Sequence, residues 1–243
     1  MAERGTLLVV DAGAERLDDL CGRLRDLGYR ALRAKTVDEG LGALADPRFA
    51  VGAVLAPPDL PAYDLERTLR AFRLSEPDAP LPLLAVGPEP ECDVRDRLRS
   101  AGVEWALWRP IHDHTLRFQV NRALAGDPAR ANARRWERVP TPWSVSIGVG
   151  AREKPGSVYS LSAQGAYLET DRPSLPSAIV HVALPLPGGE IRVTGSVVMT
   201  NVPGNLSRRT LPVGMGVRFA GHAGAAKEAL REWVLERAAA LLI

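Results

Sequence analysis

The sequence predicts two domains of different class. The first is an α/β domain with a doubly wound, five-stranded parallel sheet, and the second is mainly β, a small antiparallel barrel with a C-terminal helix. Two observations carry this prediction. Residues 5–125 alternate five times between an apolar run and an amphipathic segment of helical period. After residue 143 the runs become short, β-branched and punctuated by Pro and Gly. A chain of 243 residues is long enough to bury two cores of this kind.

In the first half, continuous apolar runs indicate strands covered by helices on both faces. The expected strands are residues 6–12, 29–34, 50–56, 81–87 and 103–110. The expected helices are residues 15–28, 36–46, 64–75, 91–102 and 113–126.

Local signals support these helices. Leu17, Cys21 and Leu24 recur at helical spacing, so Cys21 is expected to be buried, and Gly28 is placed to end the helix. Thr36 is an expected N-cap, because a glutamate follows three residues later.

This half resembles the receiver domain of two-component signalling over about 120 residues. The resemblance rests on the strand-end Asp11, the "DLPAYD" loop with Pro61, and "WRP", where Arg109 precedes a proline. It implies that functional side chains converge at the carboxyl edge of the sheet, where receivers bind Mg²⁺ and phosphorylate an aspartate.

The chain departs from the receiver pattern at each key position. Ala12 stands in the acidic pair, Pro57 at the phosphoacceptor, Gly87 at the Thr/Ser position and Arg109 at the lysine. We therefore expect a pseudo-receiver with no phosphorylation site, although Asp59, two residues beyond Pro57, is the alternative acceptor.

Residues 1–125 are thus the receiver-like domain, residues 126–133 a linker, and residues 134–243 the second domain. The expected strands of the second domain lie in residues 143–219, with "REKPG", residues 152–156, as one of the turns between them. The last 19 residues are expected to be helical throughout, with a stripe that covers the barrel and is made of Leu230, Trp233, Val234 and Leu241.

Three arginines crowd into "ARRWERVP", residues 133–140, which fits either a solvated linker or a phosphate-binding arm. The spacing Arg134-x-x-x-Arg138, followed by Ser160-x-Ser162-x-x-Gly165 and by "GMGVRF" at residues 214–219, resembles the PilZ domain, the bacterial receptor module for cyclic di-GMP. The resemblance covers residues 134 to about 237.

The resemblance implies a cyclic di-GMP site made of Arg134, Arg135, Arg138, Ser160, Ser162 and Gly165. Guanidinium groups match phosphate oxygens and the O6/N7 edge of guanine, and they stack on purines. A serine supplies a short hydroxyl, and a glycine permits a close backbone approach or a positive φ. Ser160 stands where PilZ domains that bind the nucleotide carry Asp or Asn, a change that costs about 1–2 kcal/mol of binding.

The expected function is a cytoplasmic cyclic di-GMP effector that transmits nucleotide occupancy through an interdomain rearrangement to an unidentified bacterial protein partner. The alternative is a degenerate adaptor that binds no nucleotide and acts through protein contacts. In either case the receiver-like helices offer a surface for a homodimer.

Other classes are disfavoured. The net charge of +2 argues against nucleic acid as a partner, and no apolar run is long enough for a membrane span. Catalytic and phosphate-loop motifs are missing, and the four histidines lack metal-ligand spacing, so we expect no enzyme, no metal and no cofactor. Two cysteines and the lack of a signal-like start favour a cytoplasmic location.

Overall fold

The computed structural model describes residues 5–13, 17, 19–60, 65–74, 80–125, 137–204, 211–220 and 225–243. The contacts divide the chain into two compact units. The first unit contains Met1–Arg130 and also Ala240–Ile243, and the second contains Ala131–Ala239. The chain therefore passes between the units twice.

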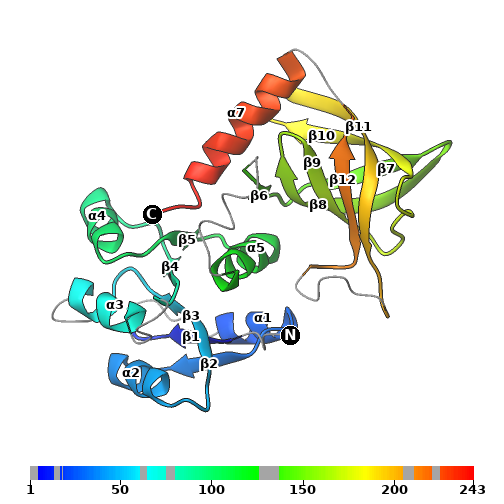
Figure 1. Ribbon diagram of the computed structural model, residues 1–243. Helices are drawn as coiled ribbons and strands as arrows, with labels where there is room; N and C mark the ends of the chain where they lie inside the picture. The colour runs from blue at the N-terminus through cyan, green and yellow to red at the C-terminus, as the bar shows by residue number, and fades with distance from the viewer. Residues whose placement is uncertain are drawn as a thin grey trace. The chain divides into compact units, whose positions relative to one another are not determined.

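The first unit is built on a parallel sheet of five strands (Figure 1). The strands are β1 (Thr6–Val10), β2 (Ala31–Ala34), β3 (Val51–Ala56), β4 (Leu83–Gly87) and β5 (Trp105–Trp108). Their order is β2-β1-β3-β4-β5, which confirms the predicted doubly wound sheet. In this topology the strand order reverses between β1 and β3, and ligands bind beyond the carboxyl ends of the strands at that point.

Helices cover both faces of this sheet. The five are α1 (Leu20–Asp26), α2 (Val37–Ala45), α3 (Leu65–Arg73), α4 (Cys92–Ser100) and α5 (Asp113–Leu124). Leu7 and Val9 of β1 pack with side chains of α1 and α5, whereas Leu8 and Val10 pack with those of α2, α3 and α4. Both faces of β1 and β4 are thus buried, which explains their unbroken apolar runs, whereas the edge strand β2 is half-buried along most of its length.

The predicted helix ends are also present. The Thr36 hydroxyl accepts a hydrogen bond of 3.1 Å from the backbone N–H of Glu39. Gly28 follows α1 with a φ of +87°, a backbone conformation that residues other than glycine adopt only at an energetic cost. Cys21 is buried, as expected, and burial raises the pKa of its thiol.

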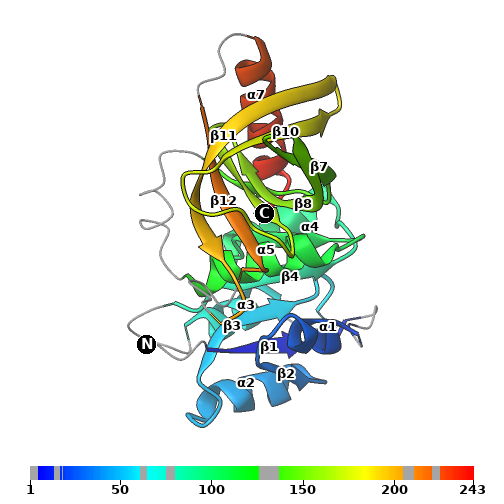
Figure 2. The ribbon, with the colours of Figure 1, turned by 90° about the vertical axis from the view of Figure 1, so that its right-hand side faces the viewer.

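The second unit is an antiparallel barrel with a helix (Figure 2). Its strands are β6 (Val139–Pro140), β7 (Ser144–Val149), β8 (Arg152–Ser162), β9 (Gly165–Glu169), β10 (Ile179–Leu186), β11 (Gly189–Asn201) and β12 (Gly214–Phe219). Strands β8, β7, β10, β11, β12 and β9 pair in that order, and β9 pairs with β8 to close the ring. The short β6 adds to β8. The predicted barrel is confirmed.

One expected turn was wrong. "REKPG" forms the first part of β8 and pairs with β7, with Pro155 opposite Ser146. The turn lies instead at Gly150 and Ala151, where Gly150 has a φ of +59°. A two-residue hairpin needs positive φ, which glycine supplies, whereas a proline that donates no hydrogen bond can remain within a strand.

The C-terminal helix is shorter than expected. Helix α7 spans Ala225–Ala239, and Leu230 and Val234 are buried as predicted. The ring of Trp233 lies 4.5 Å, centroid to centroid, from that of Trp143. Leu241, however, does not continue the stripe: it belongs to the first unit, where its backbone pairs with β5.

Candidate cyclic dinucleotide site

The strand register of the second unit brings the separated motif residues to one hairpin. In the β8–β9 hairpin, Ser162 lies opposite Gly165, and the turn between them is Ala163–Gln164. On the other side of β8, Val139 of β6 lies opposite Leu161. Arg138 precedes Val139 by one residue and is half-buried, so the register places it level with Ser162.

The two serines lie deeper than the sequence suggested. Ser160 is 4% exposed and Ser162 is 2% exposed. The Ser162 hydroxyl donates a hydrogen bond of 3.0 Å to the carbonyl oxygen of Gly165, which fastens the turn of the hairpin. Ser162 therefore shapes the hairpin, and a ligand can reach its oxygen only if the hairpin opens locally.

Gly165 is required for a close approach between strands. A Cβ atom at this position would lie 2.4 Å from the carbonyl oxygen of Val217 on β12. Of the two roles that the sequence left open, the structure selects the close approach, because the φ of Gly165 lies outside the left-handed region.

Arg134 and Arg135, the other two arginines expected at the site, lie outside the described residues. Of the expected arginines, the structure therefore positions only Arg138 at the hairpin.

Sequence reasoning missed Arg218. This residue of β12 is exposed and lies directly opposite Gly165 in the register. Paired residues of antiparallel strands project to the same face, so its cation lies on the face to which Gly165 contributes no side chain. The signal was present in "GMGVRF", in which one arginine interrupts a run of apolar and small residues.

An aromatic pair links β8 and β9, the two strands of the hairpin. The rings of Tyr159 and Tyr167 meet edge to face at 5.8 Å between centroids, and both side chains are buried. The Tyr167 hydroxyl donates a hydrogen bond of 2.7 Å to the carbonyl oxygen of Pro212. A rigid base of this kind holds the register on which the site depends.

The carboxyl edge of the first unit has a different character. An open pocket of about 400 Å³ is lined there by Asp11, Ala12, Gly13, Arg33 and Lys35. One carboxylate oxygen of Asp11 accepts a hydrogen bond of 2.7 Å from the backbone N–H of Leu17, and the other forms an ion pair with Arg33. A backbone N–H and a guanidinium thus already satisfy both oxygens that a cation would need.

The other receiver positions carry no oxygen ligand for a metal. Pro57 follows β3 and Gly87 ends β4. Asp59, the alternative acceptor, is exposed and lies over Gly13: a Cβ atom on Gly13 would be 2.5 Å from its Oδ1 atom. In the described part of the chain, His, Cys, Asp and Glu side chains nowhere gather in groups of three that could hold a metal ion.

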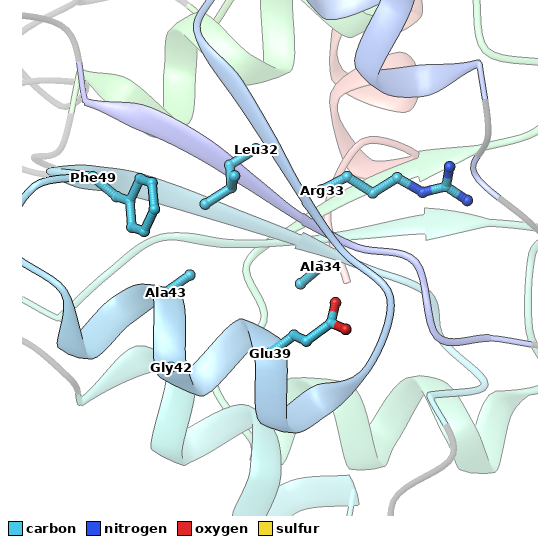
Figure 3. A pocket seen from close by; sticks show the side chains of 7 residues that line it. All are labelled: Leu32, Arg33, Ala34, Glu39, Gly42, Ala43 and Phe49. Atoms are coloured by element: carbon cyan, nitrogen blue, oxygen red, sulfur yellow. The ribbon is translucent and has the colours of Figure 1, made fainter.

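A second pocket lies on the outer side of this sheet, between β2 and α2 (Figure 3). It measures about 210 Å³ and is lined by Leu32, Arg33, Ala34, Glu39, Gly42, Ala43 and Phe49. In Figure 3 the Arg33 side chain points away from Phe49 and Ala43. The Glu39 carboxylate already accepts a hydrogen bond of 2.7 Å from the backbone N–H of Lys35. The pocket is smaller than the roughly 300 Å³ at which ligand sites begin.

Comparison with known proteins gives one family match. Residues 132–236 match the model of the PilZ domain. A search of curated proteins finds no significant match.

Among solved structures, the inhibitor of motility MotI/DgrA of Bacillus subtilis is similar, with 21% identity and a TM-score of 0.36. The similarity covers 44% of this chain, which spans about half, 51%, of the length of that protein. The chemotaxis response regulator CheY4 of Vibrio cholerae is 20% identical, covers 50% of this chain and 99% of its own, and has a TM-score of 0.42. The receiver domain of an HD domain-containing protein from Pseudomonas fluorescens Pf-5 is 20% identical and has a TM-score of 0.45. This similarity covers 56% of this chain and 96% of that domain.

Among the described residues, none of the helices has the length and hydropathy needed to cross a membrane.

Proposed function

We propose that this chain, in which a PilZ domain at residues 132–236 follows a receiver-like domain, is a signalling protein that binds cyclic di-GMP and reports its occupancy to a protein partner. The observation that carries the proposal is the strand register, which sets Arg138 level with Ser162 and Gly165 although the sequence separates them by more than twenty residues.

The chemistry of this hairpin suits a ligand with two phosphates and two guanines. Arg138 is positioned to pair with a phosphate or with the O6/N7 edge of guanine, and Arg134 and Arg135 precede it in the family motif. Each such charge-assisted contact contributes about 1.5–3 kcal/mol. Arg218 adds a cation beside Gly165 on the same face. We assign the serines a supporting role, because Ser162 holds the turn through its own hydrogen bond.

The chain is a binding protein in this proposal and not an enzyme, and its ligand is the only small molecule that it needs. Its location is the cytoplasm, where Cys21 and Cys92 remain reduced thiols, as both are free in the structure.

A second candidate function is favoured by the burial of the two serines. Ser160 replaces the acidic or amide residue of the family pattern and is nearly inaccessible. A hairpin with this closed arrangement serves equally as the scaffold of an adaptor that binds protein partners and no nucleotide.

Calorimetric titration of the full chain with cyclic di-GMP distinguishes the two functions. A cyclic di-GMP effector gives saturable heat with a dissociation constant in the micromolar range, about −8 kcal/mol of binding free energy. GTP, which presents one guanine on a linear triphosphate, is the matched control and gives no saturable heat. If cyclic di-GMP also gives none at millimolar concentration, the adaptor function replaces the first.

A further inference from the structure

The last residues of the chain leave the second unit and complete the sheet of the first. We call Ala240–Ile243 the tail. It begins directly after α7, and its contacts assign it to the first unit. Leu242 forms an antiparallel bridge with Trp105 of β5, the terminal strand of the sheet. Figure 1 marks the C-terminus close to β5 and α4.

Backbone hydrogen bonds hold the tail on this edge. The N–H of Ala106 donates to the carbonyl oxygen of Leu241 at 3.1 Å, and the N–H of Ile243 donates to that of Glu104 at 3.3 Å. Helix α4 adds a third bond, in which Nε of Arg99 donates to the main-chain oxygen of Ile243 at 3.1 Å.

The side chain of a buried glutamine also donates a hydrogen bond to the tail. Gln119 of α5 is fully buried, and its Nε2 donates to the carbonyl oxygen of Leu241 at 2.7 Å and to that of Ala106 at 3.1 Å. The Leu241 oxygen thus accepts two bonds. Without the tail, one donor hydrogen of a buried amide would lose its partner, which costs about 1–3 kcal/mol.

The tail also contributes apolar contacts. Leu241 is 4% exposed, and Ile243 packs against the core cluster that contains side chains of α3 and α4. Leu242, between them, is 39% exposed. This alternation is that of a strand with one buried face, so the tail docks as a strand with side-chain specificity.

We propose that the edge of β5 is a docking surface for the tail, and that this contact is a latch which couples α7 to the receiver-like unit. Because Ala240 follows α7 without an intervening linker, the helix and the latch share one continuous backbone. An unpaired sheet edge attracts other strands, and the latch keeps this one occupied.

The coupling rests on the proposed function. Helix α7 packs on β6 and β8, the strands that adjoin Arg138 and carry Ser160 and Ser162. The ring of its Trp233 packs at a tilt against that of Trp143, the third residue after β6. Cyclic di-GMP bound at Arg138 therefore shifts β6 and β8, the strands that contact α7. Because the tail continues directly from α7, a shift of this helix also changes the contact between the tail and β5.

Two neighbouring leucines provide a matched test without nucleotide. Leu241→Asp places a charge at the buried position and Leu242→Asp places the same charge at the exposed one. In hydrogen exchange of the full chain, Leu241→Asp should speed exchange of the amides in β5 at least tenfold, whereas Leu242→Asp should leave them as in the wild type. The amides of β1 are the internal reference for a folded first unit. Equal effects of the two substitutions would overturn the latch.

Should Leu241→Asp fail to fold, the wild-type chain decides by itself. The amides of Ala106 and Ile243 should exchange at least about a hundredfold more slowly than in an unfolded chain, because each donates a hydrogen bond in the latch. Exchange of the Ile243 amide at the unfolded rate would refute the contact.

The coupling is tested by adding cyclic di-GMP after binding has been measured by calorimetry. Saturating nucleotide should change exchange in β5 at least threefold in the wild type and leave it unchanged in Leu241→Asp, in which the latch is already open. If the nucleotide binds and β5 exchange stays constant, the coupling is wrong. If it does not bind, the proposed function fails, while the contrast between Leu241 and Leu242 still decides the latch.

Discussion

The carboxyl edge of the first unit and the β8–β9 hairpin of the second have changed in opposite ways. At the carboxyl edge, Ala12, Pro57 and Gly87 stand where receivers carry oxygens, and Arg33 neutralises the remaining Asp11. At the hairpin, Arg138 and Gly165 match the PilZ pattern, and the exposed Arg218 lies opposite Gly165.

The comparison shows that a fold tolerates the loss of a site more readily than the loss of its packing. The five-stranded sheet needs buried side chains on both faces, and these come from the strands and helices. Of the three substituted residues, only Ala12 packs against one of these clusters, where it is partly buried. In the barrel, by contrast, Gly165 is needed for the packing of β9 against β12, so the fold itself maintains this residue of the PilZ pattern.

The largest effect is expected from Gly165→Ala. The new Cβ atom would meet the Val217 carbonyl oxygen at 2.4 Å, a backbone contact that can be relieved only by moving a strand. We expect a loss of about 2–3 kcal/mol in the free energy of unfolding, measured by denaturant titration. Gly188→Ala, at a turn with nothing within 4 Å, is the control and should stay within about 0.5 kcal/mol. Equal stability of the two variants would contradict the close approach.

Arg138→Ala tests the site rather than the fold. Removal of one charge-assisted contact should weaken cyclic di-GMP binding at least tenfold, about 1.4 kcal/mol, with little change in Tm. Arg192→Ala removes an exposed arginine that pairs with Glu190 on β11, and it should bind as the wild type does. Unchanged affinity in Arg138→Ala would remove this residue from the site.

Arg33→Met tests how the receiver-like edge has been neutralised. The Asp11 carboxylate is buried, and without the guanidinium it would keep the Leu17 N–H as its hydrogen-bond partner among the described residues. We expect a loss of about 1 kcal/mol in the free energy of unfolding. Arg30→Met, at an exposed position just before β2, should leave stability unchanged. A fall as large in Arg30→Met would mean that the ion pair is not the cause.

The smallest expected effect is none at all. Incubation with acetyl phosphate, or with beryllofluoride and Mg²⁺, should alter neither the mass nor the elution volume of the protein, because Pro57 offers no acceptor and both Asp11 oxygens are occupied. Mass spectrometry and size-exclusion chromatography are the measurements. A phosphorylated peptide that contains Asp59 would show that this exposed carboxylate has taken over the role.

Much of the architecture was predictable because its signals are local. Apolar runs, the Thr36 cap and Gly28 mark the elements of the first unit within a few residues of their observed bounds. The motif residues Arg138, Ser162 and Gly165 were predicted from the resemblance of their order and spacing to the PilZ pattern. Their meeting at one hairpin, however, depends on the pairing of β6 with β8, which no local pattern encodes.

What the sequence determined by itself is the identity of the elements and the type of each sheet, since hydrophobic period and turn residues act over short range. Tertiary structure alone decided which polar groups are used up internally, such as the Ser162 hydroxyl and the Asp11 carboxylate. It also decided the conformation of the residues that follow α7. Ala and Leu favour helix, yet Leu241 leaves α7 because β5 and the buried Gln119 offer hydrogen bonds that an isolated helix end lacks.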